Sequence, residues 1–501
     1  MKTKWIFLAI FLCSTIHAQC PIYYKNTPLE KTKQDAVNLL LNQAKNCPKS
    51  IAEFNQLLQV NNLAVKTTMV ANRGKNNPSL GSFSFFASIA GAMQSGFIIQ
   101  PGEFYLGYFT GLEGDKLQLD QQPETGKLLI ELIAWDQEAQ WYDFYELRGL
   151  NNAETRWFYR GNSGDALLDN QYLYRDNPKD KPKFGKRMRC SACHNSGGPI
   201  MKEIKLPHND WWDNASQLPF LPNHPDETVE LLVNSLVDAP VFAAEVETGI
   251  KRTFQSEGLK QLRQKLSLQE RLRPLFCTTE INIESAQGNW SIPSAFWLNP
   301  LLGHLNVELS KTSYQDLLEK YNMHFPETDF RDADHAWLTP VKGRNDLLAI
   351  KQLVKEKTIT LEFAQSVLMI DFAHPVFSSE RCGLLQFIPA QDDANWLEQF
   401  SVNLKGAQEN GRALELAGYL ANDKVFNQQL FHALLVSYFE EVKQNIETVA
   451  GQQVIFGDLL RLRKAVGENE LSQNPLGQIL EPGFRVIFPV GLFLSHDPAA
   501  R

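Results

Sequence analysis

Apolar and aromatic residues between positions 63 and 160 follow a strand-like pattern. Three runs rich in aromatic and branched side chains occupy residues 104–109, 127–135 and 141–147. Turn-forming residues separate them at 113–115, 123–126 and 136–138. Runs and turns of this kind predict an antiparallel sheet. Because large aromatic side chains are usually buried, we expect them to form the core of the sheet rather than the wall of a cofactor site.

The chain before and after this region shows helical spacing of apolar residues instead. Residues 35–41 and 51–58 predict two short helices with a break at Cys47 and Pro48. Residues 161–225 carry little regular pattern. From residue 226 onward, helical spacing recurs at 347–354, 361–371, 391–404, 410–421, 427–447 and 456–466. The C-terminal part is therefore predicted to be mostly helical.

The first 18 residues have the pattern of a secretory signal peptide. Lys2 and Lys4 precede an apolar run at 5–12, and Ala18 is a small residue at a suitable cleavage point. The run is too short to span a bilayer and no other stretch approaches the required length. We therefore expect a periplasmic or secreted protein with no transmembrane segment after cleavage. Cleavage before Cys20, as in a lipoprotein, is an alternative that the bulky Gln19 disfavours.

Composition excludes one class of partner. Apolar residues make up 43% and charged residues 21% of the chain, which is typical of a globular protein. The net charge is -8, and there is no run of basic residues. Because nucleic-acid binding requires clustered lysine and arginine, we expect no nucleic-acid partner.

One short motif carries recognisable chemistry. Cys190, Cys193 and His194 form the pattern Cys-x-x-Cys-His, which attaches a c-type haem. Two thiols at this spacing can each form a thioether with one vinyl group of the same porphyrin. The histidine that follows can then supply a nitrogen to the iron as proximal ligand. With 7 cysteines and 10 histidines among 501 residues, a chance match is improbable.

This stretch resembles the haem-attachment site of c-type cytochromes, and the resemblance is limited to it. It implies one covalent haem c, held by Cys190 and Cys193 with His194 on the iron. Three other interpretations of the cysteine pair fit less well. A zinc site needs a second ligand pair, a thioredoxin-like pair needs a βαβ pattern, and a plain disulfide is sterically poor at this spacing.

The surroundings of the motif supply candidates for the remaining contacts of a haem. The second ring nitrogen of His194 should donate to a carbonyl, and the resemblance makes that of Pro199 a candidate. Met201 is a candidate distal ligand, and an open sixth position is an alternative. The rival distal ligands are Met323, Met369, His208 and His374. Arg187, Arg189 and Lys202 could pair with the propionates or form a solvated loop, and Trp211 and Trp212 could stack on the porphyrin or fill the core.

The other cysteines suit an oxidising compartment. Cys13 leaves with the signal peptide, so four remain outside the motif. We expect the disulfides Cys20–Cys47 and Cys277–Cys382, because even cysteine counts in exported chains usually indicate bridges. Four buried free thiols are the alternative.

These observations predict an α+β protein with five regions: a signal peptide at 1–18, an N-terminal helical segment at 19–62, an antiparallel β-rich domain at 63–175, a haem-c attachment region at 176–225, and a mostly helical domain at 226–501. The expected function is that of an exported c-type cytochrome in electron transfer or redox chemistry. A haem-dependent enzyme of oxygenase, peroxidase or isomerase type, with an open sixth position, is one alternative and a haem-based sensor is another. The partner is accordingly a redox protein or a small-molecule substrate, and whether the protein is an enzyme is open.

Overall fold

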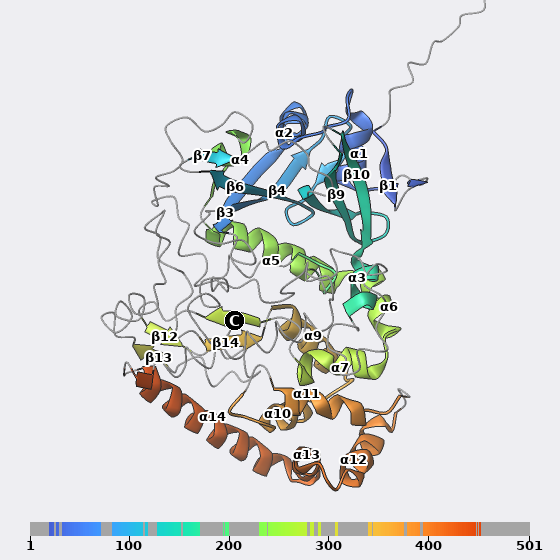
Figure 1. Ribbon diagram of the computed structural model, residues 1–501. Coiled ribbons are helices and arrows are strands. Elements are labelled where there is room, and N and C mark those ends of the chain that lie inside the picture. Colours follow the sequence, from blue (N-terminus) through green and yellow to red (C-terminus); the bar gives the residue numbers. More distant parts are fainter. Residues whose placement is uncertain are drawn as a thin grey trace, which may run out of the picture.

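The structure is a computed structural model that describes residues 20–451 with internal gaps (Figure 1). The gaps are 25–26, 30–32, 72–82, 114–115, 119–127, 152–153, 171–193, 195, 200–229, 238, 278–280, 285–288, 292–305, 309–338, 343, 375–377, 391–393, 447 and 449. The predicted signal peptide and the apolar stretch at 456–466 lie outside the described residues.

The N-terminal half forms one ten-stranded sheet, in the order β2-β1-β10-β9-β8-β6-β4-β3, with β5 paired to β4 and β7 to β6. Its strands are β1 (Ile22–Tyr24), β2 (Thr27–Pro28), β3 (Ala64–Ala71), β4 (Phe83–Ala92), β5 (Ile98–Ile99), β6 (Phe104–Glu113), β7 (Lys116–Gln118), β8 (Leu128–Asp136), β9 (Trp141–Asn151) and β10 (Glu154–Asn162). Among the described strands of this sheet, every pairing is antiparallel except that of β1 with β10. The predicted antiparallel sheet is therefore confirmed.

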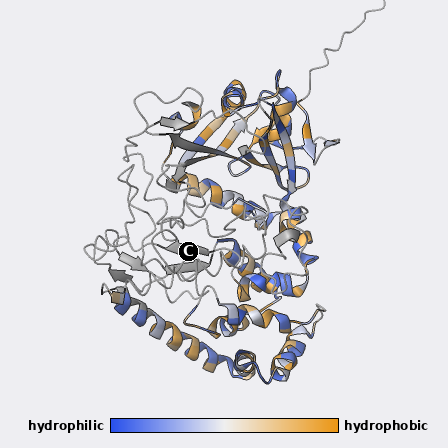
Figure 2. Ribbon diagram, viewed as in Figure 1, coloured by the Kyte–Doolittle hydropathy of each residue, from blue (hydrophilic) through white to orange (hydrophobic). Residues whose placement is uncertain are grey.

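Helices cover both faces of this sheet. The two predicted N-terminal helices, α1 (Ala36–Gln43) and α2 (Ile51–Val60), pack on one face, where the ring of Phe54 lies 5.5 Å from that of Trp157. Helix α5 (Ala239–Gln255) crosses the other face, and the hydroxyl of Tyr105 donates to the carbonyl of Glu245 at 2.7 Å. Burial on both faces explains why β4 and β8 carry runs of apolar residues instead of a strict alternation, and Figure 2 shows apolar residues in several strands of the sheet.

A short helix, α3 (Ser163–Asn170), follows directly on the last strand of the sheet. It falls where the apolar pattern predicted little regular structure. Reciprocal capping marks its start: the side chain of Asn162 accepts from the backbone of Asp165 at 3.1 Å, and the carboxylate of Asp165 accepts from the backbone of Asn162 at 3.0 Å. The spacing Asn-x-x-Asp is therefore the local signal for this helix.

The C-terminal half is mostly helical, as predicted. Its described helices are α4 (Glu230–Asn234), α5, α6 (Glu257–Gln264), α7 (Leu268–Phe276), α9 (Arg344–Lys355), α10 (Leu361–Met369), α11 (Ser379–Gly383), the 3-10 helix η9 (Leu384–Phe387), α12 (Trp396–Gly406), α13 (Gly411–Ala421) and α14 (Lys424–Ile446). Two short antiparallel pairs, β11 (Ile281–Glu284) with β14 (Thr339–Lys342) and β12 (Asn289–Ser291) with β13 (Asn306–Glu308), were not predicted. The molecule is thus α+β.

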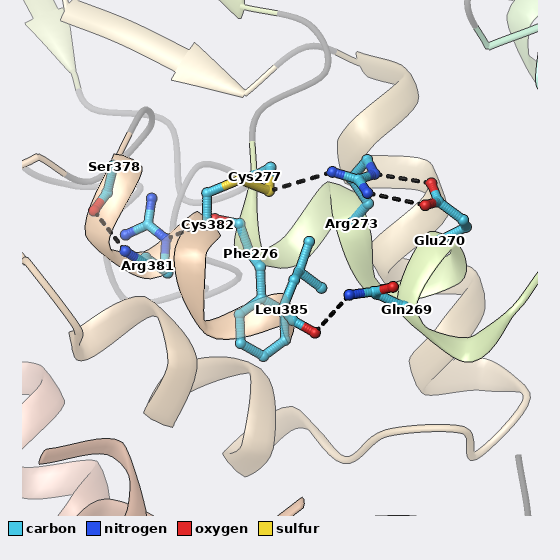
Figure 3. The surroundings of a disulfide bond; sticks show 9 residues. All are labelled: Gln269, Glu270, Arg273, Phe276, Cys277, Ser378, Arg381, Cys382 and Leu385. Atoms are coloured by element: carbon cyan, nitrogen blue, oxygen red, sulfur yellow. Dashed lines mark hydrogen bonds and ion pairs between the residues drawn. A yellow bond between two sulfur atoms is a disulfide. The ribbon is translucent and has the colours of Figure 1, made fainter. Parts of the chain in front are cut away.

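A disulfide and a buried arginine join α7 to the later helices (Figure 3). Cys277, at the end of α7, is bonded to Cys382 in α11. The side chain of Arg381 is fully buried and donates to the carbonyls of Phe276 at 3.3 Å and Ile370 at 3.2 Å. Residues far apart in the sequence are thereby fixed around one helical core.

Both predicted disulfides are present. Cys20 is bonded to Cys47, which ties the start of the described chain to the loop between α1 and α2. Within the described residues, no helix combines the length and the apolar character that crossing a bilayer requires.

Candidate functional site

His194 lies between the sheet and α5, at the edge of a segment that the structure describes only in part. Its ring packs against that of Phe144 in β9, with the ring centroids 5.6 Å apart. Phe144 is buried and belongs to the face of the sheet that α5 covers. Of the residues predicted to bind haem, Cys190, Cys193 and Met201 lie outside the described residues.

A tight turn fixes the imidazole of His194. The Nδ1 atom donates to the carbonyl of Gly198 at 2.9 Å, and the backbone of Gly197 donates to the carbonyl of His194 at 2.8 Å. Gly197 has a φ of +78°, a conformation that glycine adopts without strain. The neutral tautomer with its proton on Nδ1 carries its lone pair on Nε2, so this hydrogen bond sets the ring as a metal-binding histidine requires.

The acceptor of this hydrogen bond corrects one expectation. We expected the carbonyl of Pro199, but the carbonyl of Gly198 fills this role. The reason is packing. Gly198 is pressed against α5, where a Cβ atom would lie 2.5 Å from Oγ1 of Thr253, while the ring of Pro199 contacts Gly249 of the same helix. The carbonyl that accepts from His194 is therefore that of Gly198, one residue before Pro199.

The candidate distal ligands are not gathered around His194 in the described part of the chain. Met369 is buried in α10, which packs on α7, α13 and α14. His374 follows the same helix, and its Nδ1 hydrogen-bonds to the carboxylate of Asp371 at 2.9 Å. His208, Met323, Arg187, Arg189, Lys202, Trp211 and Trp212 lie outside the described residues.

A cavity of about 110 Å³ lies directly beside the turn that holds His194. Ser196, two residues after the histidine, is part of its wall, and the other lining residues come from α3, α5, α6, α7, α9 and the residues that adjoin them. Arg263 of α6 reaches this cavity, and its Nη1 donates to the carbonyl of Thr253 at 3.2 Å. Thr253 thus contacts both the turn at Gly198 and the arginine of the cavity.

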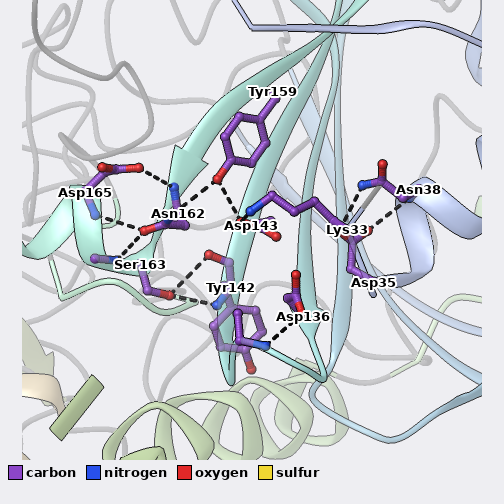
Figure 4. A network of polar contacts seen from close by, with 12 residues as sticks. Lys33, Asp35, Asn38, Asp136, Tyr142, Asp143, Tyr159, Asn162, Ser163 and Asp165 are labelled. Atoms are coloured by element: carbon purple, nitrogen blue, oxygen red, sulfur yellow. Dashed lines mark hydrogen bonds and ion pairs between the residues drawn. The ribbon is translucent and has the colours of Figure 1, made fainter. Parts of the chain in front are cut away.

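A second polar site lies on the opposite face of the sheet, where three buried aspartates meet (Figure 4). Asp35, Asp136 and Asp143 bring carboxylate oxygens within 4.8 Å of one another. Asp35 is the N-cap of α1 and also accepts from the hydroxyl of Tyr145 at 2.6 Å. Lys33 adds a positive charge, with its Nζ 3.6 Å from Oδ1 of Asp143.

Burial raises the pKa of two carboxyl groups in this cluster, those of Asp35 and Asp143. Burial raises the pKa of Asp35 to about 6, although its hydrogen bond from Tyr145 acts in the opposite direction. Burial, together with the negative charge of Asp35, also raises the pKa of Asp143. Because Lys33 already neutralises part of this charge, the cluster is best described as a structural network that joins α1 to the sheet, and it carries no assignment as a metal centre.

The residues that meet around the cavity and in the aspartate cluster could not be predicted to be neighbours from the sequence. Ser196, Thr253 and Arg263 come from three different segments, and nothing in their local patterns connects them. The aspartates at 35, 136 and 143 are likewise separated by whole elements. The one local signal is the motif that ends in His194.

Comparisons of the chain with protein-family models, with curated proteins and with solved structures found no match. The function is therefore argued from the residues alone.

Proposed function

We propose that this protein is an exported redox protein that carries one covalent haem, attached through Cys190 and Cys193, with His194 as the proximal ligand of the iron. The observation that carries the proposal is the hydrogen bond from Nδ1 of His194 to the carbonyl of Gly198, directly after the Cys-x-x-Cys-His motif. Proximal histidines of metal centres almost always have such a partner, because it fixes the ring and strengthens the ligand.

The chain's own residues support this role by holding one imidazole rigidly. Phe144 packs against the ring, and the turn at Gly197 and Gly198 prevents it from rotating. A haem attached here would supply an iron centre that accepts and donates one electron. Rigid ligation favours such transfer, because little reorganisation accompanies the change of charge.

Two further features support an exported protein. Disulfides persist in oxidising compartments, and two of them close this chain, Cys20–Cys47 and Cys277–Cys382. The N-terminal 18 residues have the composition of a signal peptide. The periplasm or the extracellular space is therefore the proposed location, with a redox protein or a small molecule as the partner.

A haem-dependent enzyme is the second candidate function, and the cavity beside Ser196 favours it. An electron carrier has no need of a ligand cavity next to its haem. If the sixth position is open, a small substrate in this cavity would lie near the attachment site. With Met201 on the iron, by contrast, the protein would be a low-spin electron carrier with a positive potential.

The attachment can be tested by cysteine substitution in a host that matures c-type cytochromes. Acid-acetone extraction of the wild type should leave the haem on the polypeptide, because thioether bonds resist it. The double variant Cys190→Ala, Cys193→Ala should lose its covalent haem. The double variant Cys277→Ala, Cys382→Ala is the matched control: it also lacks two cysteines, yet should keep the haem. Extraction of the colour from the wild type would refute covalent attachment.

The iron ligands can be tested by spectroscopy. His194→Gly should lose the normal spectrum of the reduced protein and regain it when imidazole is added, because free imidazole can occupy the vacated position. Met201→Ala should convert a low-spin spectrum to high spin if Met201 is the distal ligand. A high-spin wild type that binds carbon monoxide in the ferrous state would support the enzyme instead.

A further inference from the structure

The cavity beside Ser196 has an apolar wall built from several helices. Its apolar side chains come from α3, α5, α7, α9 and the turn after α6: Leu167, Phe254, Leu266, Pro274, Ala349 and Leu353. Phe254, Leu266, Pro274 and Ala349 are only half-buried, so part of their surface remains exposed to water. Because apolar surface is unfavourable in water, a molecule that covers it would be bound by the hydrophobic effect.

The acidic residues of the wall are already engaged within the protein. Both carboxylate oxygens of Glu270 accept from Arg273, each at 2.9 Å. Glu356 lies at an exposed position and accepts from Gln352 at 2.7 Å. Asp346 is buried and has contacts of its own in the fold. The acidic groups therefore do not call for a cationic ligand.

The basic residues of the wall are engaged in the same way. The guanidinium of Arg263 lies over the ring of Phe254, 4.3 Å from its centroid, and Nζ of Lys260 lies 3.4 Å from Oε2 of Glu257. Arg271 also has contacts of its own. Three basic and three acidic residues thus line the cavity, so their charges cancel and the wall favours neither an anion nor a cation.

The buried polar atoms of the wall are not open to a ligand. Nη2 of Arg263 and Oγ of Ser196 have no hydrogen-bond partner among the described residues, but protein atoms enclose both and a molecule in the cavity cannot reach them. The polar groups that water does reach lie at the rim, at the exposed residues Gln264 and Glu356. An apolar interior behind a polar rim is typical of a small-molecule site.

The volume of the cavity limits its ligand to a few atoms. It measures about 110 Å³. An apolar cavity of about 150 Å³ in another protein binds benzene or xenon. The cavity beside Ser196 therefore suits a xenon atom or a molecule of roughly three to five carbon atoms.

We propose that this cavity binds a small uncharged apolar molecule, such as a short hydrocarbon or a dissolved gas. Ser196 lies in its wall only two residues after His194, so the bound molecule would be close to the haem proposed above. A role of this molecule as substrate or gaseous ligand of that haem rests on the proposed function. Binding itself depends only on the residues of the wall.

Xenon NMR of the protein tests the proposal, because the chemical shift of dissolved xenon responds to binding. Xenon should bind with a saturable dependence on protein concentration, and propane should displace it. Ethanol has the size of propane but carries a hydroxyl group that would be buried without a partner, so propane should bind at least about tenfold more tightly. Equal affinities of propane and ethanol overturn the proposal, and so does the absence of saturable xenon binding.

Two variants change the cavity in opposite directions and leave every charge in place. Ala349→Leu adds an isopropyl group to the wall and should abolish xenon binding. Leu353→Ala enlarges the cavity and should bind benzene at least about tenfold more tightly than the wild type does. Ala433→Leu, at an exposed position of α14, is the control and should bind xenon like the wild type.

A general loss of structure cannot explain weaker binding in one variant and tighter binding in the other. The proposal fails if Ala349→Leu binds xenon like the wild type, or if Leu353→Ala binds benzene no better than the wild type.

Comparison of haem-loaded and haem-free protein separates this inference from the proposed function. The haem-free variant Cys190→Ala, Cys193→Ala should still bind xenon, and acid-acetone extraction measures the haem content of both forms independently. Xenon binding by a wild type that lacks covalent haem would support the cavity and refute the haem attachment. Covalent haem in a wild type that binds no xenon, with no binding by the haem-free variant either, would refute the cavity alone.

Discussion

The turn after His194 can pack closely on α5 because residue 198 is a glycine and has no side chain. A Cβ there would lie 2.5 Å from Oγ1 of Thr253, which itself donates to the carbonyl of Gly249 at 2.9 Å. A larger residue requires either the loop or the side chain of Thr253 to shift. A shift of the loop would also move the carbonyl that orients the imidazole.

If the protein carries the proposed haem, Gly198→Ala should keep it but change the midpoint potential of its iron. Loss of the Nδ1 hydrogen bond weakens the imidazole as a donor to the iron, which shifts the midpoint potential in the positive direction. Protein-film voltammetry measures this shift. The double variant Gly198→Ala, Thr253→Ala removes the clash and should return the potential toward that of the wild type, and Thr253→Ala alone should hardly change it. A single variant with an unaltered potential would contradict the role assigned to the Gly198 carbonyl.

The buried aspartates predict an unusual dependence of stability on pH. The folded-state pKa of Asp35 is raised to about 6, above its ordinary value of 3.8. The folded protein therefore binds more protons than the unfolded chain between about pH 4 and pH 6, and stability falls as pH rises through this window. The contribution is fully present below the unfolded pKa and is lost above pH 6. The pKa of Asp143 is raised as well, in the same direction.

Asp143→Asn should stabilise the protein at pH 7 by about 1 to 3 kcal/mol. Oδ1 of Asp143 accepts from the hydroxyl of Tyr159 at 2.9 Å, and an asparagine can keep this bond. Oδ2 is buried without a hydrogen-bond partner among the described residues, and an amide there would be uncharged and able to donate. Urea denaturation at pH 4.5 and pH 7.5 measures the effect.

The gain from Asp143→Asn should shrink at the lower pH, where the wild-type carboxyls are protonated. Glu257→Gln, at a side chain that is 61% exposed, is the control and should change little at either pH. Equal stability of Asp143→Asn and the wild type at pH 7.5 would contradict the raised pKa values.

At the residue scale, the sequence offered one contiguous motif, and the haem attachment that it indicates stays a prediction because Cys190 and Cys193 lie outside the described residues. Cys190, Cys193 and His194 were singled out because their spacing is the one that c-type haem attachment requires. The packing of Phe144 and Thr253 around the turn at His194 could not be predicted, because these residues come from segments distant in the sequence. The candidate acceptor for Nδ1 of His194 was the carbonyl of Pro199, one residue after the observed acceptor, Gly198. The packing of Gly198 on α5, which the sequence does not reveal, favours the earlier carbonyl.

At the scale of elements, the sequence predicted what short-range patterns control. The strands β6, β8 and β9 and the helices α9, α10, α12, α13 and α14 lie where aromatic runs and helical spacing predicted them, whereas α5, α6 and α7 were not predicted individually. Side-chain N-caps fix the first residue of several helices; examples are Ser267 before α7 and Thr360 before α10. The strand β1, of three residues, and the pair β11–β14 were missed because their partners are distant in sequence, and β12 and β13 were missed because strands of three residues carry too little pattern.

The two disulfides should differ in what they contribute to stability. Cys20–Cys47 spans a sequence separation of 27 and Cys277–Cys382 one of 105. In the chain-entropy model these loops stabilise by roughly 3 to 4 and roughly 5 kcal/mol. Cys277→Ala, Cys382→Ala should therefore lower the free energy of unfolding more than Cys20→Ala, Cys47→Ala, as measured by urea denaturation. The reverse order would show that native packing, and not loop length, sets the contribution.

At the scale of the whole molecule, the fold class followed from the order of patterns along the chain. A strand-rich first half followed by a helix-rich second half predicts α+β, and the structure has this arrangement. How α5 leaves the helical half to cover the sheet could not be predicted, because its helical pattern does not reveal which surface it covers. The position of α5 provides the surface on which the turn after His194 packs, and it provides part of the wall of the cavity beside Ser196.

Intact-mass spectrometry of the protein from the periplasmic fraction of a producing host should test two predictions, export and haem attachment, in one measurement. Removal of residues 1–18 and attachment of one haem together fix the mass of the mature chain, which should begin at Gln19. The Cys190→Ala, Cys193→Ala variant should show the same cleavage without the mass of the haem. An uncleaved chain in the periplasmic fraction, or a mature chain that begins with a lipid-modified Cys20, would contradict the proposed processing.

The parallel pairing of β1 with β10 has a consequence for the order in which the protein can form. Ile22 lies opposite Trp157, so the first strand of the sheet to be synthesised has to wait for the last. The sheet can grow from the β3 edge in chain order as far as β10, but β1 can join it only after β10 has formed, and contacts this distant in sequence slow folding. Meanwhile the local disulfide between Cys20 and Cys47 can already close the loop that carries α1. The edge of the sheet that leaves the ribosome first is therefore the edge that is completed last.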